Sequence, residues 1–571
     1  MLKLVRFLKP YKVQVILGPM FKLVEAVFEL IIPLIMARVI DIGVKNRDVG
    51  YVFKMGIVMI LLGAVGFCST FVCQYFAAKS SQGFGTNLRN ALFEHINEFS
   101  HRELDKFSSG SLITRLTSDV NQLQLSVAMF IRLVIRAPFL IVGSIIMAIS
   151  IDLKISMIFL VTSLLISVSL YFIITKSVPF LKKIQKSLDK LALITKEDLE
   201  GTRVIRAFSK QDWSKSRFNN VNSDILEISC RVSKISSLLN PVTYVAINLA
   251  IVCIIWFGGM RAYHGDITQG EIIALVNYMM QILLALIVVS NLIVIFTKAF
   301  ASADRINEIL DTKISIQNNY RKIYVKSENA IKIEFDNVSF KYTENSKYAI
   351  ENINLSIDYG EKVGIIGATG SGKSTFANLI PRFYDVSKGS ILLNGINVKD
   401  YNILDLRRRI SIVHQNSVLF RGTIKQNLRW GKEDASDKEI KEALEISQSL
   451  DFVNEKPNKF NELVEEGGRN FSGGQKQRLT IARAIIKKPE ILILDDSFSA
   501  LDQETENRLR NAIMERFKDN TIIFISQKSK SIKNCDKIIV FDNGKIVGEG
   551  NHNSLLETCG VYKNICESQS C

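Results

Sequence analysis

The chain has 571 residues, of which 47% are hydrophobic, and it carries a formal net charge of +16. This length exceeds that of one domain. The eight cysteines show no CxxC pair and no metal-like spacing, which argues against a disulfide framework or a zinc site and suits a reducing cytosol. No nucleic-acid motif accompanies the positive charge, so we expect the basic residues to face anionic lipid headgroups rather than nucleic acid.

The first 300 residues contain six long apolar stretches, each near the 20 residues that a membrane-spanning helix needs. We place the predicted spans at residues 14–40, 52–78, 127–151, 155–175, 242–263 and 272–299. The segment 176–239 carries thirteen Lys and Arg, whereas the segments after the first, third and fifth spans are poorer in them. Because basic loops stay inside, this side is cytoplasmic. We therefore predict a multi-pass protein of the cell membrane with both termini in the cytoplasm.

Two groups of charged residues fall inside the predicted spans. Lys22, Glu25 and Glu29 lie on one helical face of the first span, and Arg132 and Arg136 are spaced i, i+4 in the third. A charge inside the bilayer is costly unless it faces a cavity or a partner. Two interpretations stay open: a cavity that receives a charged substrate, and interfacial or intersubunit pairing near the inner leaflet.

From about residue 331 the chain repeats the order strand, loop, helix. The run Gly367–Ser374 follows an apolar strand, precedes a helix and matches the phosphate-loop pattern G-x-x-x-x-G-K-S/T. We expect its backbone N–H groups to hold the phosphates of ATP, with Lys373 on the β- and γ-phosphates and Ser374 on Mg²⁺. The predicted ATP-binding residues here are Gly367, Thr369, Gly370, Ser371, Gly372, Lys373, Ser374 and Thr375.

A second motif distinguishes among the proteins that have phosphate loops. The run Ser472, Gly473, Gly474 and Gln475 opens a helix just before an apolar strand that ends at Asp495. At this point the chain resembles the ATP-binding cassette (ABC) transporters, and the resemblance covers nearly all of it. In that family two cassettes hold two ATP molecules head to tail, each between one chain's phosphate loop and the other chain's signature. The resemblance implies a second half-transporter as partner, whose ATP this signature contacts.

Other cassette motifs match the family residue by residue. Tyr342 corresponds to the aromatic residue that stacks on adenine, and Gln415 to the glutamine that touches magnesium and couples to the membrane half. The resemblance thus implies a Mg²⁺ site at Ser374, Gln415 and Asp495. The loop that communicates between the two ATP sites corresponds to Ser499, Ala500, Leu501 and Asp502.

The membrane half resembles exporters with six spans per cassette. Its segments near 104–120 and 197–212 match the two cytoplasmic coupling regions of that family. We therefore expect an all-α transmembrane domain with six spans and long cytosolic helix extensions over residues 1–310. A linker over 311–330 and an α/β phosphate-loop cassette over 331–571 would follow.

Two residues depart from the family pattern. Asp496 stands where a catalytic Glu is usual, and Gln527 where the switch His is usual. A general base must reach within about 2.6–3.2 Å of the proton it takes, and Asp is one methylene shorter than Glu. Gln can donate a hydrogen bond but cannot become cationic. With an intact signature, the two changes match the weak-site subunit of heterodimeric exporters, whose partner carries the Glu and the His.

The sequence thus predicts an ATP-dependent efflux half-transporter that moves amphipathic small molecules, lipids or peptides. A homodimeric exporter with slow ATPase activity is one alternative. An ATP-gated regulatory or channel-like protein on the same scaffold is another. The richness in Lys, Ile and Asn is typical of an AT-rich bacterial genome.

Overall fold

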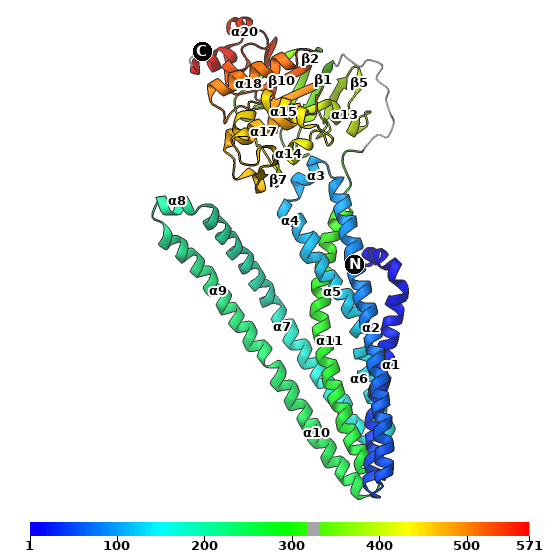
Figure 1. Cartoon of the computed structure of the whole chain (residues 1–571). Coiled ribbons are helices and arrows are strands. Elements are labelled where there is room, and N and C mark those ends of the chain that lie inside the picture. The colour runs from blue at the N-terminus through cyan, green and yellow to red at the C-terminus, as the bar shows by residue number, and fades with distance from the viewer. Residues whose placement is uncertain (318–331, 570–571) are drawn as a thin grey trace. The chain divides into compact units, whose positions relative to one another are not determined.

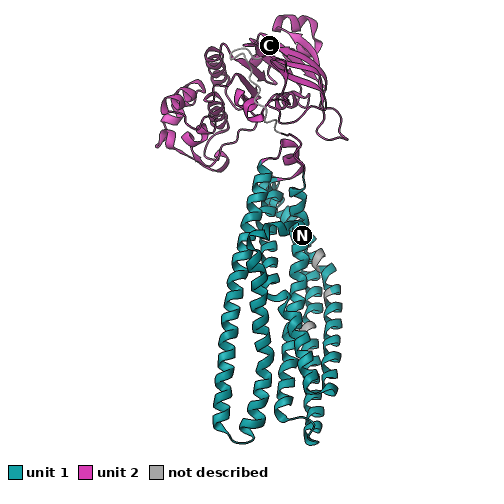
Figure 2. Ribbon diagram, turned by 90° about the vertical axis from the view of Figure 1, so that its right-hand side faces the viewer, with its two compact units in different colours: residues 1–97, 109–312 teal, residues 98–108, 313–571 magenta. Residues whose placement is uncertain are grey.

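The computed structural model describes residues 1–317 and 332–569 of the chain. Contacts divide the chain into two compact units (Figure 2): residues 1–97 with 109–312, and residues 98–108 with 313–571. The short segment 98–108, expected in the membrane half, therefore groups with the cassette. Most of the predicted linker, residues 318–330, lies outside the described part of the chain.

Unit 1 is built of long helices (Figure 1). The longest are α1 (Lys12–Arg38), α2 (Val49–Asn97), α7 (Leu153–Glu200), α9 (Gln211–Ser237), α10 (Leu239–Tyr263) and α11 (Gln269–Leu310). Between α2 and α7, after the short segment that belongs to unit 2, the chain runs through α4 (Ser109–Thr114), η3 (Arg115–Asp119), α5 (Val120–Met129), η4 (Phe130–Val134) and α6 (Arg136–Ile151). Shorter pieces complete the unit: η1 (Leu2–Tyr11), η2 (Val39–Val44) and α8 (Thr202–Ala207).

Within the described residues, five helical segments are long and apolar enough to cross a membrane. They cover residues 49–97, 109–151, 153–200, 211–263 and 269–310, and each contains one of the predicted spans. The remaining predicted span corresponds to α1, whose 27 residues reach about 40 Å but carry three charged residues in their middle. Several of the helices are far longer than a bilayer requires, as expected for helices that continue into the cytosol.

A buried apolar cluster holds the helices of unit 1 together. It draws side chains from α1, α6, α7, α10 and α11, including the fully buried Phe159 and Tyr278. The Tyr278 hydroxyl donates a 2.7 Å hydrogen bond to the backbone oxygen of Leu30, which satisfies the polar end of this ring. Helices α7 and α9 run side by side and diverge from the remaining helices toward α8 (Figure 1).

Four of the five residues in the two charged groups predicted inside the spans are paired within one chain. The Arg136 guanidinium on α6 lies 2.7 Å from Glu29 and 3.9 Å from Glu25 on α1, and Lys22 pairs with Glu25. Pairing lowers the cost of placing these charges in the membrane. Arg132 has no ion pair among the described residues.

Unit 2 contains the cassette, whose main sheet has the strand order β12-β11-β3-β10-β9-β6. Its strands are β3 (Lys362–Gly367), β6 (Ile410–Val413), β9 (Ile491–Asp495), β10 (Thr521–Ile525), β11 (Lys537–Asp542) and β12 (Lys545–Gly550). Neighbouring strands pair in parallel except β11 and β12. A second, antiparallel sheet has the order β2-β1-β4-β5, formed by β1 (Ile333–Phe340), β2 (Ile350–Ile357), β4 (Lys388–Leu393) and β5 (Ile396–Asn397).

Helices cover the main sheet of the cassette. The first is α12 (Lys373–Leu379), which follows β3, and the others are α13 (Ile403–Arg409), α14 (Ile424–Arg429), α15 (Asp437–Ile446), α16 (Leu450–Asn454), α17 (Gly473–Ile485), α18 (Gln503–Arg516), α19 (Ser529–Ile532), α20 (His552–Thr558) and α21 (Gly560–Ser568). A separate two-stranded sheet is formed by β7 (Gly422–Thr423) and β8 (Leu463–Val464). The short 3-10 turn η5 (Lys459–Asn461) precedes β8, and the 3-10 turn η6 (Glu466–Gly468) follows it. The central strands β3, β9 and β10 are buried along their whole length, in keeping with the apolar residues that make up most of each strand.

The first predicted coupling region begins in unit 2, with helix α3 (His101–Lys106). Ser100 and Glu103 form a capping box that starts this helix. The His101 ring stacks on Phe383 with centroids 4.3 Å apart, and the Tyr384 hydroxyl donates a 2.6 Å hydrogen bond to Asp105. An aromatic contact and a charge-assisted hydrogen bond thus attach this segment to the cassette.

Asp119 anchors the other end of this coupling region inside unit 1. Its side chain is 4% exposed, forms an ion pair with Arg305 and accepts a 2.9 Å hydrogen bond from Ser302 of α11. We expect Asp119→Ala to destabilise unit 1 by about 1–3 kcal/mol, because two donors lose a charged acceptor. The measurement is thermal unfolding of the detergent-solubilised protein.

The matched control is Glu227→Gln, which removes an exposed ion pair with Arg231 one helical turn away. Exposed ion pairs contribute little to stability, so we expect the free energy of unfolding to change by no more than about 0.5 kcal/mol. Equal midpoint shifts for the two variants would contradict the anchoring role of Asp119.

Candidate functional site

The predicted site residues gather at one edge of the main sheet. Strands β3, β6, β9 and β10 are parallel, so the loops after them leave from the same edge. These loops carry the phosphate-loop residues, Gln415, Asp495 with Asp496, and Gln527. This edge is where open parallel α/β sheets bind ligands.

The phosphate loop runs from the end of β3 into α12. Gly370 and Gly372 have φ angles of 82° and 103°, a left-handed conformation that glycine adopts at little cost. The Lys373 ammonium folds over the loop and donates to the backbone oxygens of Gly367 at 2.8 Å and Ala368 at 2.7 Å. Burial lowers the pKa of Lys373, while Asp495 and Asp496 act in the opposite direction.

Ser374 joins the phosphate loop to the end of β9. Its hydroxyl donates a 3.1 Å hydrogen bond to Asp495, whose residue is only 5% exposed. Burial raises the pKa of Asp495, and the hydrogen bond from Ser374 partly offsets this. A hydroxyl and a carboxylate at this distance are hard oxygen donors of the kind that Mg²⁺ binds, so these residues fit that ion.

Asp496 occupies a restricted position just after the strand. Its φ is 46°, and its backbone N–H donates a 2.9 Å hydrogen bond to the backbone oxygen of Ile525 on β10. Asp tolerates this left-handed conformation better than most residues with longer side chains. The Gln415 amide donates a 3.1 Å hydrogen bond to its carboxylate, and burial raises the pKa of Asp496.

Gln527 lies opposite the phosphate loop. Its side-chain oxygen accepts a 3.4 Å hydrogen bond from the Thr369 hydroxyl. Its backbone oxygen accepts a 2.7 Å hydrogen bond from Gln569, and the Gln569 side-chain oxygen accepts from the Ser529 N–H at 2.8 Å. The side-chain amide of Gln569, just after α21, thus forms hydrogen bonds to two residues of the loop that holds Gln527. Gln569 could not be predicted from the sequence, because no motif marks it and more than forty residues separate it from this loop.

Tyr342 lies just beyond β1, beside a cavity of about 560 Å³ that Phe340, Thr343, Tyr384 and Arg102 also line. Its hydroxyl and the Thr375 hydroxyl are 2.9 Å apart, which ties the aromatic ring to the start of α12. The ring is 39% exposed, and its neighbour Tyr384 meets it edge-on at 5.3 Å. A half-exposed ring beside a cavity can accept the face of a nucleobase.

The predicted signature begins α17 through local hydrogen bonds. Ser472 is the N-cap residue, and its backbone N–H donates a 3.0 Å hydrogen bond to the side-chain oxygen of Gln475. Among the described residues, no hydrogen bond or ion pair joins Ser472, Gly473, Gly474 or Gln475 to the phosphate loop of the same chain. The signature and the phosphate loop are therefore separate parts of the site.

The communication loop, Ser499–Asp502, lies against the signature helix. Gln477 of α17 donates to the Ser499 hydroxyl at 3.2 Å and accepts from the Ala500 N–H at 3.1 Å. A Cβ on Gly474 would lie 3.0 Å from the backbone oxygen of Ala500, so only a glycine fits there without displacement. Asp502 ends the loop as the N-cap residue of α18, and hydrogen bonds with Thr505 lower its pKa. Gln477 is not among the predicted site residues, although its place inside the signature helix could have indicated it.

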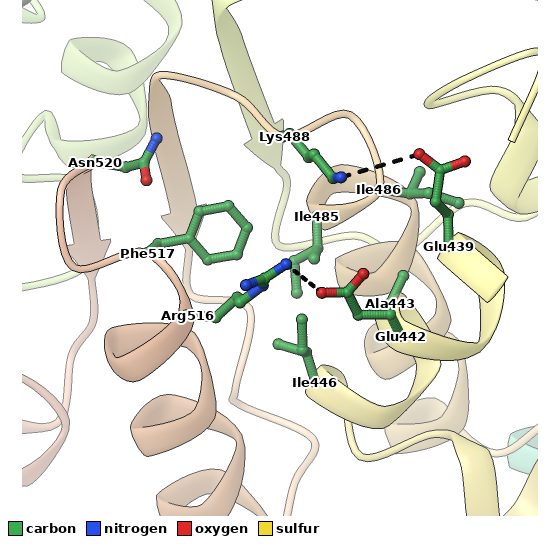
Figure 3. Close-up of a pocket in the computed structure, with 10 residues that line it drawn as sticks. All are labelled: Glu439, Glu442, Ala443, Ile446, Ile485, Ile486, Lys488, Arg516, Phe517 and Asn520. Atoms are coloured by element: carbon green, nitrogen blue, oxygen red, sulfur yellow. Dashed lines mark ion pairs between the residues drawn. The ribbon is translucent and has the colours of Figure 1, made fainter. Parts of the chain in front are cut away.

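A smaller cavity of about 180 Å³ opens elsewhere in the cassette (Figure 3). It lies between α15, the end of α17 and the end of α18, and two ion pairs flank it, Arg516 with Glu442 and Lys488 with Glu439. None of the predicted site residues lines it.

Comparison with protein families covers both halves of the chain. Residues 15–286 match the model described as ABC transporter transmembrane region, and residues 350–499 match the model described as ABC transporter. The first match includes α1, the helix whose charges distinguish it from the other spans. ATP binding follows from the second match.

Individual relatives extend over the whole chain. It is 37% identical, over all of its length and 98% of the relative, to an uncharacterized ABC transporter ATP-binding protein, YfiB, of Bacillus subtilis. It is 31% identical over 88% of its length, and 85% of the relative, to an ATP-dependent lipid A-core flippase of Hahella chejuensis. A solved bacterial Atm1-family ABC exporter with ATP bound shares the fold, with a TM-score of 0.81, 21% identity and coverage of 100% and 99% of the two chains.

The Gln569 contacts generate a testable prediction. We expect Gln569→Ala to increase amide hydrogen exchange at Ser529 about fivefold, since a lost hydrogen bond contributes about 1 kcal/mol. Gln569→Glu keeps an acceptor for the Ser529 N–H but loses the donor to Gln527, so it should keep Ser529 protected. Hydrogen exchange followed by mass spectrometry measures both.

The control for this prediction is Ser568→Ala, at the neighbouring position, whose hydroxyl donates to the backbone oxygen of Ile565 within α21. It should leave exchange in the loop unchanged. If Gln569→Ala also leaves it unchanged, the amide does not hold the loop.

Proposed function

The chain belongs to the ABC transporter family, and on that basis we propose that it is an ATP-driven export half-transporter that works with a second, catalytically complete half-transporter. The observation that carries this proposal is the pair Asp496 and Gln527 at the edge of the main sheet. Both hold the positions of catalytic groups, yet neither has the chemistry that rapid hydrolysis requires. The signature of the same chain is intact.

The proposed ATP site uses the phosphate loop and Tyr342. The residues Gly367, Thr369, Gly370, Ser371, Gly372 and Thr375 surround the phosphates, and Tyr342 stacks on the adenine. Lys373 releases its backbone contacts to pair with the β- and γ-phosphates. Ser374, Asp495 and Gln415 would hold Mg²⁺, which would neutralise phosphate charge when bound.

We infer slow hydrolysis at this site from the surroundings of Asp496. Its carboxylate is one methylene shorter than that of Glu, and Gln415 already donates to one of its oxygens at 3.1 Å. A base that is both short and engaged is poorly placed to orient the attacking water. Gln527 adds a neutral amide where a cationic switch group is usual in the family.

The signature is proposed to act on the partner's ATP. Ser472 and the N–H groups at the start of α17 present donors that suit a γ-phosphate. No hydrogen bond among the described residues commits this end of α17 to the chain's own phosphate loop. Through Gln477 the signature also contacts Ser499 and Ala500, so an event at one ATP site can reach the other.

For the membrane half we propose export across the cell membrane, with both termini in the cytoplasm. Amphipathic small molecules, lipids and peptides are the proposed substrates, in keeping with the apolar helices of unit 1. Several relatives named as lipid A-core flippases support the lipid class. ATP would close the two cassettes, and α3 with the segment near 197–212 would pass that closure to the spans.

The two-site arrangement predicts unequal effects of two substitutions. Lys373→Ala should lower ATP occupancy at the weak site but leave about half or more of the ATPase rate of the complex. Ser472→Arg places bulk and charge against the partner's γ-phosphate, so it should lower the rate about tenfold or more. The measurement is steady-state ATPase activity of the purified complex.

Lys563→Ala, which alters an exposed cassette lysine paired with Glu567, serves as the control and should have no effect. If Lys373→Ala proves the more harmful variant, the strong and weak sites are reversed. Equal effects in a complex of identical chains would favour the homodimeric alternative.

A repair experiment tests the weak site itself. We expect Asp496→Glu combined with Gln527→His to raise the ATPase rate less than about tenfold, although general base catalysis contributes about 10²–10⁴-fold. Glu must adopt the left-handed backbone of position 496, which costs about 1–2 kcal/mol, and the partner's signature must also face this site.

ATPase activity and substrate accumulation are measured together in reconstituted inside-out vesicles. A hundredfold rise in both would mean that Asp496 and Gln527 alone limit the site. A gated leak without accumulation would favour the channel-like alternative instead.

A further inference from the structure

The ion-pair cluster of unit 1 carries more positive than negative charge. Lys22, Arg132 and Arg136 contribute three cations, and Glu25 and Glu29 contribute two anions. Lys22 and Arg136 are paired with these carboxylates. The excess cation is Arg132, whose Nε is buried and donates to no partner among the described residues.

Arg132 lies in an irregular part of its helix. Segment η4 (Phe130–Val134) has π-helical hydrogen bonding between two regular α-helices. Single π-turns inside α-helices occur frequently at functional sites. The preceding residue, Ile131, is buried against α1 close to Gly18, so η4 is packed between helices although the Arg132 side chain is partly exposed.

Other polar groups without partners lie along the contact between α1 and α2. The Gln14 side-chain oxygen on α1 and the fully buried Ser80 hydroxyl on α2 have no hydrogen-bond partner in the described part of the chain. The two helices approach each other where Gly18 meets Phe76 and where Tyr11 meets Gly83, and these contacts bracket Gln14 and Ser80. Buried polar groups are normally satisfied, so this group calls for a polar partner.

The depth of Arg132 in the bilayer matches the depth at which lipid headgroups lie. From Arg132 to Asp152, which ends the helix α6 on the outer side in the proposed orientation, the helix is about 30 Å long at 1.5 Å per residue. The hydrocarbon core of a bilayer is about 30 Å thick. Arg132 therefore lies at the inner boundary of that core, where the headgroup of an inner-leaflet amphiphile is found.

We propose that Arg132 binds the anionic headgroup of the amphiphile that this transporter moves. The inference rests on the proposed function and narrows its substrate class to amphiphiles with a phosphate or carboxylate group. A guanidinium binds such groups through two parallel hydrogen bonds, which suits planar recognition of an anion. The bound anion neutralises the excess charge of the cluster.

A cationic substrate fits this cluster less well, because both carboxylates are already engaged by Arg136 and Lys22. Membrane phospholipids offer the same anionic chemistry as a transported amphiphile. The test therefore separates recognition of the anion from its transport.

The first arm measures equilibrium binding without ATP. The complete transporter is placed in nanodiscs of zwitterionic phosphatidylcholine, and the probes are lysophosphatidylglycerol and lysophosphatidylcholine with the same fluorescent acyl chain. We expect the anionic probe to bind about tenfold or more tightly. Arg132→Gln should abolish this preference, since a charge-assisted hydrogen bond accounts for about tenfold or more in affinity.

Two further variants make this arm decisive. Arg132→Lys keeps the charge without the planar fork, so it should retain part of the preference and shows that the fold tolerates change at this position. Arg38→Gln removes an exposed cation from the other end of α1 and should leave the preference intact. An unchanged preference in Arg132→Gln, or an equal loss in Arg38→Gln, overturns the proposal.

The second arm measures ATP-driven movement of fluorescent phosphatidylglycerol and phosphatidylcholine between leaflets in proteoliposomes. Faster movement of the anionic lipid, lost in Arg132→Gln, is the expected result. Anion binding without such movement, while another amphiphile is moved, identifies a resident membrane lipid and overturns the proposal. If no amphiphile is moved at all, the proposed export function fails, while the binding arm still decides whether Arg132 recognises the anion.

Discussion

The balance of buried charge at the edge of the main sheet organises the cassette. Asp495 and Asp496 end a fully buried strand, and burial raises the pKa of both carboxyl groups. Lys373 offsets this cost by its charge, and Ser374 and Gln415 do so by hydrogen bonds; these residues come from the phosphate loop and from the loop after β6. Phosphate and a divalent cation that bind together would stabilise a site of this kind, because each compensates buried charges that the protein alone neutralises only in part.

The proposed slow hydrolysis depends on the geometry of Asp496 at the same edge. The left-handed backbone and the hydrogen bond to Ile525 hold its Cα in place, so side-chain length alone decides how far the carboxylate reaches. Gln569 holds the loop of Gln527 from the other side. A well-ordered site with a short carboxylate supports the proposal that this chain binds ATP and assists a partner rather than turning ATP over rapidly.

Tyr384 connects the nucleotide side of the cassette to the first coupling region. Its ring meets Tyr342 edge-on, while its hydroxyl bonds to Asp105, and burial together with this bond raises the pKa of the Tyr384 hydroxyl. A ligand that stacks on Tyr342 is therefore separated from the segment around Asp105 by the ring of Tyr384. That segment continues along the chain into η3, which is hydrogen-bonded to α11. In unit 1, Lys22, Glu25, Glu29 and Arg136 are paired with one another, whereas Arg132 has no ion pair among the described residues, and for it we propose an anionic ligand.

Much of this protein was determined by local sequence. Apolar stretches of sufficient length, the phosphate-loop pattern and the signature each encode their structure within a few residues, so the helical membrane domain and the α/β cassette could be predicted. So could the positions of Lys373, Ser374 and Asp495 at one sheet edge, because parallel strands send their loops the same way.

Contacts between residues far apart in the chain were decided only by the tertiary structure. The clamp of Gln569 on Gln527, the pairing of Arg136 with Glu29, and the grouping of residues 98–108 with the cassette depend on how helices pack. Spacing along one helix shows which residues share a face, but the neighbour that covers that face is set by packing across the whole unit. For this reason the sequence alone could not distinguish Arg132 from Arg136. The fold shows that Arg136 is paired with Glu29, whereas Arg132 has no ion pair among the described residues.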